Sequence, residues 1–372
     1  MGERFLLIVF LVFTITAAIQ IFYYLYFYLA ISTKKPIEKK VNHEPVSIII
    51  CARNEEENLR NFLPSILEQD YPAYEVIVVN DCSEDGTYLV LGEYLKKYQN
   101  LRVSTITKDP KFTHYKKFAQ FIGIKAAKHE LLLFTDADCT PVSKEWIEGI
   151  VSNFDDKTNY VLGYGGYLKA PGLLNAYIRN ETFVIAIQYL GMAIRGIPYM
   201  AVGRNLAYRK SEFFNNGGYG LYSHLASGDD DLFINNNAKP ENTVCEYRHP
   251  TQTRSVACKT TEEWIKQKQR HLTTASYYKP SHKFLLIMEP LTRMLFYTSF
   301  IVLVSLQYLW IEALSVLGFR LITQIIVFAL AQKKLKEPGL MPYSIFFDIF
   351  SPIINGILFI SRGRNKGINQ WS

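Results

Sequence analysis

The chain is poor in cysteine and lacks the glycine-rich motifs of several nucleotide-binding enzymes. Its 372 residues include only five cysteines, an odd number without a CxxC pair, which argues against a disulfide framework or a zinc ribbon. No GxGxxG follows an apolar run and no GxxxxGK[ST] occurs, so the sequence lacks the signatures of dinucleotide oxidoreductases and P-loop NTPases. The net charge of +7 suits anionic lipids or a phosphorylated ligand, and net charge alone gives no reason to expect a nucleic-acid partner.

Charge is also missing from a long N-terminal stretch, which predicts a membrane anchor. The run Phe5–Ile31 has no charged residue and is longer than the ~20 residues that span a bilayer. It also exceeds the apolar core of a signal peptide, about 7–15 residues, so we expect a retained transmembrane anchor in residues 1–33. The lysines that follow place the next segment in the cytoplasm by the positive-inside rule; they are Lys34, Lys35, Lys39 and Lys40.

The C-terminal part is apolar again. Met294–Ile311 is uncharged and Ala313–Gln332 carries only one arginine, which predicts two spanning helices joined by a short turn near Glu312. The third apolar segment, Tyr343–Ile360, contains Asp348, Pro352 and Asn355 and has basic residues on both sides. This pattern favours a re-entrant or interfacial hairpin. We therefore expect a membrane region over residues 290–361 and a basic cytoplasmic tail over residues 362–372.

Residues 41–285 predict one cytoplasmic α/β domain. Three runs that are apolar throughout suit strands covered on both faces, as in a parallel sheet. Amphipathic segments separate these runs, and the alternation is typical of a doubly wound fold. The expected strands are Val46–Cys51, Glu75–Val79 and Glu130–Thr135, and the expected helices are Glu56–Glu68, Thr87–Tyr98 and Lys116–Lys128.

Polar residues follow each of the three expected strands, where ligands bind in open α/β sheets. Capping of the next helix explains the loop around Ser83 and Asp85, but it does not explain all three loops. The sharpest signal is Asp136-Ala137-Asp138 after Leu-Leu-Leu-Phe-Thr. In an extended strand both carboxylates would share a face, and paired carboxylates suit Mg²⁺ or Mn²⁺ held partly by substrate phosphates.

Taken together, these segments resemble the family 2 glycosyltransferases of the GT-A fold, in their membrane-anchored branch. The resemblance implies a doubly wound, Rossmann-like mixed α/β sheet with one N-terminal and two to three C-terminal membrane helices. The matching segments, in order along the chain, are VSIIICARNEEEN (46–58), EVIVVNDCSEDGT (75–87), LLLFTDADCTP (131–141), GRNLAYRK (203–210), SGDDDL (227–232) and WIKQKQRH (264–271).

The resemblance implies a nucleotide-diphosphate sugar as donor, usually a UDP-sugar. Its motifs would place the nucleoside along Ala52, Arg53 and Glu55, with Asp81 bonded to the base. Lys117 would lie near the nucleotide or its phosphates, and Asp136 and Ala137 beside the ribose and diphosphate. Asp138 would be the direct metal ligand, with Asp136 nearby. A solvated helix face is the other interpretation of Lys117.

A second acidic motif, Asp229-Asp230-Asp231, would supply the general base that deprotonates an acceptor hydroxyl. The alignment permits either Asp229 or Asp230, and we favour Asp230; a solvated surface loop is the alternative. On the acceptor side the resemblance implies Gly203, Arg204 and Asn205. The segment Ile185–Met200 is apolar enough to lie at the membrane interface, although a buried core helix explains it equally well.

The segment Trp264–His271 resembles the family's QxxRW motif, with Trp264, Gln267, Arg270 and His271 on one helix face. An amphipathic surface helix would show the same spacing. By this resemblance Gln267 and Arg270 would bind the donor, and His271 would lie on the acceptor side. His271 stands where the family has tryptophan, which casts doubt on processive synthesis.

The sequence therefore predicts a multi-pass protein of the cytoplasmic membrane, with an inverting hexosyl- or N-acetylhexosaminyltransferase domain in the cytoplasm. It would use Mg²⁺ or Mn²⁺ and a nucleotide-diphosphate sugar, and modify a lipid-linked or glycan acceptor of the cell envelope. Two alternatives stay open: a processive polysaccharide synthase of the same fold, and a non-catalytic membrane-anchored protein that binds nucleotide sugars.

Overall fold

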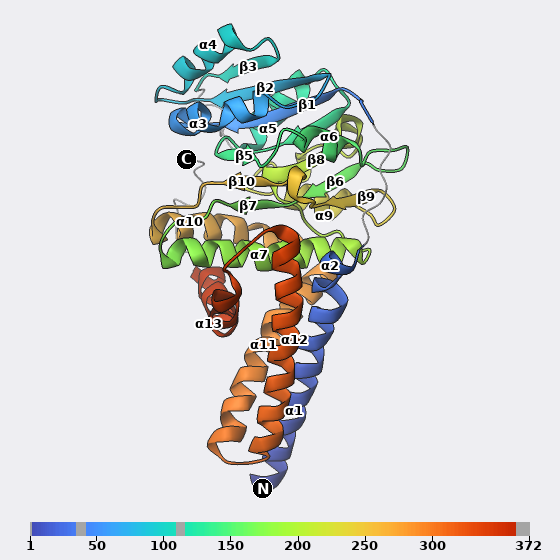
Figure 1. Ribbon diagram of the computed structural model, residues 1–372, viewed down its shortest axis with the longest axis vertical. Helices are drawn as coiled ribbons and strands as arrows, with labels where there is room; N and C mark the ends of the chain where they lie inside the picture. The colour runs from blue at the N-terminus through green and yellow to red at the C-terminus, as the bar shows by residue number, and fades with distance from the viewer. Residues whose placement is uncertain (1, 35–41, 109–115, 362–372) are drawn as a thin grey trace.

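A seven-stranded mixed sheet forms the centre of the α/β domain (Figure 1). The computed structural model describes residues 2–34, 42–108 and 116–361. The strand order is β3-β2-β1-β4-β8-β6-β9, with β8 antiparallel to both neighbours and the other pairs parallel. The predicted doubly wound mixed sheet is thus confirmed. Its strands are β1 Val46–Ala52, β2 Tyr74–Asp81, β3 Leu101–Ile106, β4 Leu131–Phe134, β6 Tyr160–Gly163, β8 Leu206–Arg209 and β9 Thr243–Glu246.

Helices cover both faces of this sheet, which explains why its first strands are apolar throughout. Ile48 and Ile50 of β1 are buried in one core cluster with helices α3, α4 and α6. Ile49 and Cys51 are buried in another with helices α5, α7 and α9, because successive side chains of a strand point to opposite faces. The bounds of these helices are α3 Glu56–Leu67, α4 Thr87–Lys97, α5 Lys116–Ala126, α6 Trp146–Val151, α7 Leu173–Ile194 and α9 Asp231–Asn237.

A small second sheet joins three segments from distant parts of the chain, in the order β5-β10-β7. It consists of β5 Cys139–Pro141, β7 Gly165–Tyr167 and β10 Thr253–Ser255. Because β5 begins directly after Asp138, this sheet fixes the position of the loop that carries Asp136 and Asp138. The remaining short elements are α2 Ala30–Thr33, α8 Lys210–Asn215, α10 Thr261–Leu272, a π-helical turn at Tyr23–Tyr28, and 3₁₀ turns at Gly203–Asn205, Gly220–Tyr222, His249–Thr251 and Thr274–Tyr277.

Among the residues that the structure describes, four helices are long and apolar enough to cross a membrane. Three of them form a bundle below the α/β domain, and α7 lies across its upper end (Figure 1). The predicted turn near Glu312 comes earlier: α11 ends at Ser305 and α12 begins at Trp310, so Glu312 lies in the first turn of α12. The four candidate spans are Gly2–Thr33 (α1 to α2), α11 Pro280–Ser305, α12 Trp310–Leu335 and α13 Met341–Ser361.

The expected hairpin over Tyr343–Ile360 is absent, since α13 is one continuous helix that includes Pro352. It is strongly foreshortened in Figure 1, so it runs at a steep angle to α1, α11 and α12. The α13 side chains Phe347 and Ser344 contact α7, through Tyr177 and Asn180 respectively. The lysines at positions 35, 39 and 40 and the basic tail at 362–372 lie outside the described residues.

Asp348, which argued against a simple span, is neutralised by two arginines from the bundle. Its carboxylate lies 3.1 Å from Nη1 of Arg293 in α11 and 2.6 Å from Nη1 of Arg320 in α12. Glu289 balances the second positive charge at 3.0 Å from Arg293, and Arg320 also donates to the hydroxyl of Tyr24 in the N-terminal helix at 2.5 Å. Ionised groups in apolar surroundings persist only when paired, so this cluster ties the four helices together.

We predict that Asp348→Asn destabilises the protein by about 3–5 kcal/mol, because removing one partner of a buried pair leaves an uncompensated charge. The measurement is thermal unfolding of the detergent-purified protein. Glu312→Gln, at an exposed position of α12, is the matched control and should unfold like the wild type. Equal unfolding temperatures for Asp348→Asn and the control would contradict the role of the cluster.

Candidate active site

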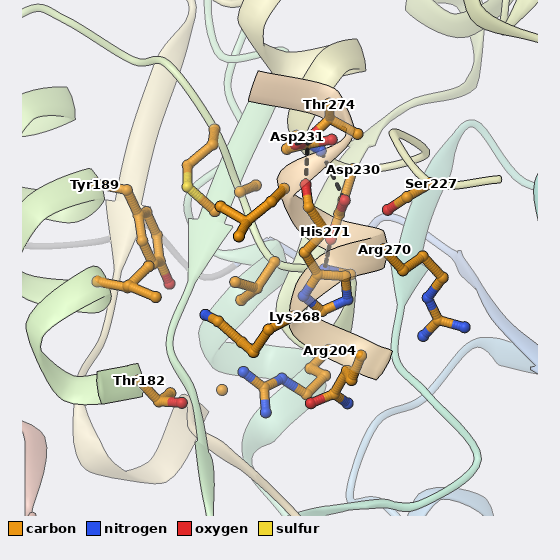
Figure 2. A pocket seen from close by; sticks show the side chains of 18 of the residues that line it. Thr182, Tyr189, Arg204, Ser227, Asp230, Asp231, Lys268, Arg270, His271 and Thr274 are labelled. Atoms are coloured by element: carbon orange, nitrogen blue, oxygen red, sulfur yellow. Dashed lines mark hydrogen bonds between the residues drawn. The ribbon is translucent and has the colours of Figure 1, made fainter. Parts of the chain in front are cut away.

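A cavity of about 360 Å³ lies between the carboxyl ends of the central strands, helices α7 and α10, and the loop before α9. It brings together most of the acidic and basic residues that the sequence analysis singled out. The predicted residues that line it are Asp136, Asp138, Gly203, Arg204, Asp229, Asp230, Gln267, Arg270 and His271. Figure 2 shows part of this pocket, with Tyr189 and Thr182 of α7 facing the side chains of α10.

The carboxylates of Asp136 and Asp138 lie close together because of a turn, and not because they share one face of a strand as the sequence suggested. Strand β4 ends at Phe134, and the two aspartates lie in the turn that follows rather than in an extended strand. Oxygen atoms of both, with the sulfur of Cys139, lie within 4.8 Å of one another. Two carboxylates at this spacing fit a hard divalent cation such as Mg²⁺ or Mn²⁺, whereas Ala137 points into the core.

Different surroundings push the pKa values of the two aspartates apart. Burial raises the pKa of Asp136, but Lys116 outweighs burial and holds that pKa below its usual range. Burial and the charge of Asp136 raise the pKa of Asp138. The hydroxyl of Ser255 donates to Oδ2 of Asp138 at 2.5 Å and keeps this carboxylate in place.

Lys116 connects the two acidic motifs. Its ammonium lies 2.6 Å from Oδ1 of Asp136 and 3.5 Å from Oδ2 of Asp229. Burial lowers the pKa of Lys116, but the nearby carboxylates outweigh burial and raise it well above its usual value. The sequence analysis missed this residue. No sequence signal separates it from Lys117, because its approach to Asp136 depends on how α5 packs on β1, where a Cβ at Gly123 would overlap Ile49.

Lys117, which the resemblance placed near the donor, is not among the residues that line the pocket. Its ammonium donates to the backbone carbonyls of Tyr222 and Ser227, at 2.8 Å in the second case. The side chain is 3% exposed, and burial lowers its pKa to about 8. The described contacts of Lys117 are therefore with the loop before Asp229, where Ser227 lines the pocket, and its burial excludes a solvated helix face.

The three consecutive aspartates have three different environments. Asp231 is buried and accepts hydrogen bonds from Thr274 and Tyr278, the latter at 2.7 Å. Asp229 is also buried and faces Lys116. Asp230 is partly open to the pocket, where its Oδ2 accepts from the backbone N–H of Gly203 at 2.6 Å. Burial, followed by Asp229 and Asp231, raises the pKa of Asp230 to about 8.

The opposite wall of the pocket is basic. Lys268 and Arg204 reach toward the same part of the pocket below His271, and Arg270 extends to the other side of α10 (Figure 2). Arg204 stacks on Tyr167 at 4.3 Å from the ring centre. Lys268 pairs with Glu181 of α7 at 2.9 Å. Desolvation in the pocket and the neighbouring cations hold the pKa of His271 well below its usual range, so its imidazole is neutral at pH 7.

Asn205 lies in the core instead of the pocket. It has no exposed surface, and its amide is fully engaged. It accepts from Nε1 of Trp146 at 3.1 Å and donates to the carbonyls of Tyr164 and Thr251. Those bonds hold β8 against the neighbouring loops, so the structure leaves the side chain of Asn205 no contact with the acceptor side.

The remaining predicted donor residues lie at the carboxyl ends of β1 and β2, next to the pocket but not in its lining. Ala52 and Asp81 have no exposed surface, and Arg53 is half-buried. Burial raises the pKa of Glu55 to about 7, and Asp138 and Asp136 add to the rise although the amide of Asn58 opposes it.

The far end of the pocket is apolar. Ile185 of α7, Met200 and Leu286 of α11 line it, while the other face of α7 packs on the membrane helices, as in the contact of Phe183 with Phe328. The sequence left open whether Ile185–Met200 lies at the membrane interface or in the core. The structure shows α7 packed between the sheet and the helix bundle, in contact with both.

Comparisons with known proteins identify the domain. Residues 47–213 match the model of glycosyl transferase family 2. The chain is 36% identical to the glycosyltransferase AglE of Haloferax volcanii over 187 residues, which cover 50% of this chain and 58% of AglE. It is 31% identical to the probable glycosyltransferase YdaM of Bacillus subtilis over 187 residues, covering 47% of this chain and 42% of YdaM. The matches thus span about half the length of these relatives.

A solved structure has the same fold over nearly the whole chain. It is the mannosyltransferase PcManGT of Pyrobaculum calidifontis, in complex with GDP-Man and Mn²⁺. The TM-score is 0.61 at 15% identity, and the match covers 93% of this chain and 99% of PcManGT. The chain therefore matches glycosyl transferase family 2 over residues 47–213 and shares the fold of this GT-A-type neighbour, as the sequence motifs indicated.

We predict that Mn²⁺ raises the melting temperature of Lys116→Gln more than that of the wild type. Without the ammonium, Asp136 and Asp229 lose their counter-charge, and a bound cation would supply it. A ligand stabilises the folded state in proportion to RT ln(1 + [L]/Kd), so the melting temperature should rise further with Mn²⁺ in the variant than in the wild type. Lys117→Gln is the matched control, and an identical Mn²⁺ response in all three proteins would contradict this assignment.

Proposed function

We propose that this protein is a membrane-bound inverting glycosyltransferase that moves a hexosyl or N-acetylhexosaminyl group from a nucleotide-diphosphate sugar to a lipid-linked or glycan acceptor. The observation that carries the proposal is one pocket with two separate acidic motifs, bridged by Lys116, beside a basic helix and an apolar wall. In this proposal residues 41–285 are the catalytic domain, and residues 1–33 and 290–361 hold it on the membrane.

On the donor side, Asp138 and Asp136 are the residues that would hold Mg²⁺ or Mn²⁺. When bound, such an ion supplies positive charge that stabilises a departing diphosphate. Arg270 of α10 lines the same pocket. Lys116 lies close enough to Asp136 for its ammonium to pair with a diphosphate that binds there. The strand-end residues Ala52, Arg53, Glu55 and Asp81 would line the nucleoside, next to the pocket at the ends of β1 and β2.

On the acceptor side, Asp230 is the proposed general base. Of the three aspartates it is the one partly open to the pocket, and the N–H of Gly203 fixes its carboxylate. An acceptor hydroxyl must lose a proton as it attacks the anomeric carbon, and a carboxylate with a raised pKa accepts that proton readily near neutral pH. The polar groups of Arg204, Glu181, Lys268 and His271 would bind the rest of the acceptor.

The membrane helices support an acceptor that is itself membrane-bound. The apolar end of the pocket reaches Leu286 in the first part of α11, a candidate span. Lys34, Lys333 and Lys334 lie at the ends of their helices nearest the α/β domain, and an excess of lysine marks the cytoplasmic side. We therefore place the catalytic domain at the cytoplasmic face of the cell membrane, where membrane lipid surrounds the bundle.

The choice of nucleotide is open to a direct experiment. UDP is the usual nucleotide of the family that the motifs resemble, whereas the structural neighbour from Pyrobaculum holds GDP-Man with Mn²⁺. The purified full-length protein should release nucleotide slowly from one donor in a panel of UDP-, GDP- and dTDP-sugars with Mn²⁺ or Mg²⁺. Asp138→Ala should abolish this release, and absence of both release and donor binding across the panel would refute the proposal.

We predict that the rate of transfer rises with pH through about 8. Asp230 acts as a base only when it has lost its proton, and its raised pKa keeps it protonated at lower pH. Asp230→Asn should lower the rate by about 100-fold or more, the range of general base catalysis, and should remove this pH dependence. Asp156→Asn, at an exposed position, is the control. An unchanged pH profile in Asp230→Asn would exclude Asp230 as the base.

A further inference from the structure

A buried carboxylate in the turn between α12 and α13 bonds directly to the α/β domain. Glu337 is 2% exposed and lies just after the end of α12. Its Oε1 accepts from Nη1 of Arg254 at 2.6 Å and from the hydroxyl of Tyr164 at 2.8 Å. Its Oε2 accepts from Nη2 of Arg179 at 2.8 Å. Helices α12 and α13 and the turn between them are here called the membrane hairpin. One side chain from this hairpin therefore contacts β10, α7 and the residue before β7.

The charges at this contact leave little freedom to rearrange. Arg179 and Arg254 are 6% and 11% exposed, and Glu337 is the carboxylate that the structure pairs with both. A guanidinium does not lose its proton in proteins, so without Glu337 both arginines stay charged in buried surroundings. Arg254 would then keep only neutral acceptors, which are the side chain of Gln252 and the backbone carbonyls of Leu335 and Lys336. Gly166 leaves room for the contact, because a Cβ at that position would overlap Nη1 of Arg254.

Arg254 lies between two residues that hold the pocket in shape. Thr253 donates through its hydroxyl to the backbone carbonyl of Arg204 at 2.9 Å. On the other side, Ser255 donates to Oδ2 of Asp138 and pairs with Cys139 of β5 in the small sheet. A displacement of Arg254 would therefore move the strand that fixes the Asp138 carboxylate. Arg179 lies in α7, and its hydrogen bond to Glu337 does not run through β10.

We propose that Glu337 is a positioning residue for the metal site: the membrane hairpin holds β10 through Arg254, and β10 holds Asp138 through Ser255. This inference rests on the proposed function in so far as it takes Asp138 to be a metal ligand. It makes the α12–α13 turn a part of the active site that acts without touching substrate. The hairpin would thus do more than anchor the domain on the membrane.

The test compares three variants of the full-length protein in detergent: Glu337→Gln, Arg254→Gln and Arg179→Gln. Mn²⁺ binding is followed by electron paramagnetic resonance with the metal alone. We expect Glu337→Gln and Arg254→Gln to weaken Mn²⁺ binding by about tenfold, the lower end of the range for partners beyond the ligands themselves. Arg179→Gln breaks the same cluster but not the path to Ser255, so it should lower the melting temperature and leave Mn²⁺ affinity unchanged.

Hydrogen exchange in the metal-free variants tests the positioning claim independently of metal binding. Glu337→Gln and Arg254→Gln should speed exchange at the amides of Thr253–Ser255 and Cys139, and Arg179→Gln should not. Equal effects of all three variants on exchange and Mn²⁺ affinity, or none, would overturn the proposal. If Asp138→Ala binds Mn²⁺ as tightly as the wild type, the assignment of Asp138 as a metal ligand fails. The positioning of β10 by Glu337 is a separate claim, and unchanged exchange in Glu337→Gln would refute it.

Discussion

Mutual repulsion of carboxylates is the constraint on which this structure depends. Five aspartates line one pocket, and carboxylates so close together cannot all be ionised unless something compensates them. The fold gives each a different environment. Lys116 compensates Asp136 and Asp229, hydroxyl groups satisfy Asp231, and Ser255 orients Asp138. Asp230 remains, with a raised pKa and an opening to the pocket. These distinct environments allow similar side chains to take different chemical roles.

Helix α7 links this electrostatic arrangement to the bundle of candidate membrane-spanning helices. One face of the helix contributes Glu181 and Ile185 to the pocket, and the other packs on the long helices through Phe183 and Asn180. The α/β domain is therefore packed directly against these helices. Contacts connect α7, the turn after α12 and the paired charges around Asp348. The proposed acceptor end of the pocket and the candidate spans therefore have fixed relative positions.

The sequence predicted the fold well where the signal was local. The apolar runs of β1, β2 and β4 and the amphipathic helices between them appear within one to two residues of their expected bounds, because burial on both faces leaves a pattern that needs no tertiary information. The acidic motifs were also visible, since they follow apolar runs at the strand ends where ligands bind in open α/β sheets. The α11–α12 turn was placed too late, because Leu306–Leu309 carries no charged residue and no glycine, proline, asparagine or aspartate that would mark a turn.

What the sequence could not give was the direction of individual side chains. Lys116 and Lys117 are neighbours of the same type, and only the packing of Gly123 on β1 decides which one enters the pocket. Asn205 belongs to a motif that suggests a site, yet its amide is used within the core. Glu337 and Ser255 depend on contacts between segments more than 80 residues apart, and no local pattern reports such contacts.

The most direct test of the account is to locate a metal ion and a nucleoside diphosphate in the full-length protein. A crystal grown with Mn²⁺ and UDP or GDP would place the ion by its anomalous signal. The account predicts the manganese peak within bonding distance of the Asp138 carboxylate, with the diphosphate between it and Arg270 and the Lys116 ammonium moved off Asp136. A diphosphate bound outside this pocket, or a manganese peak away from Asp138, would contradict it.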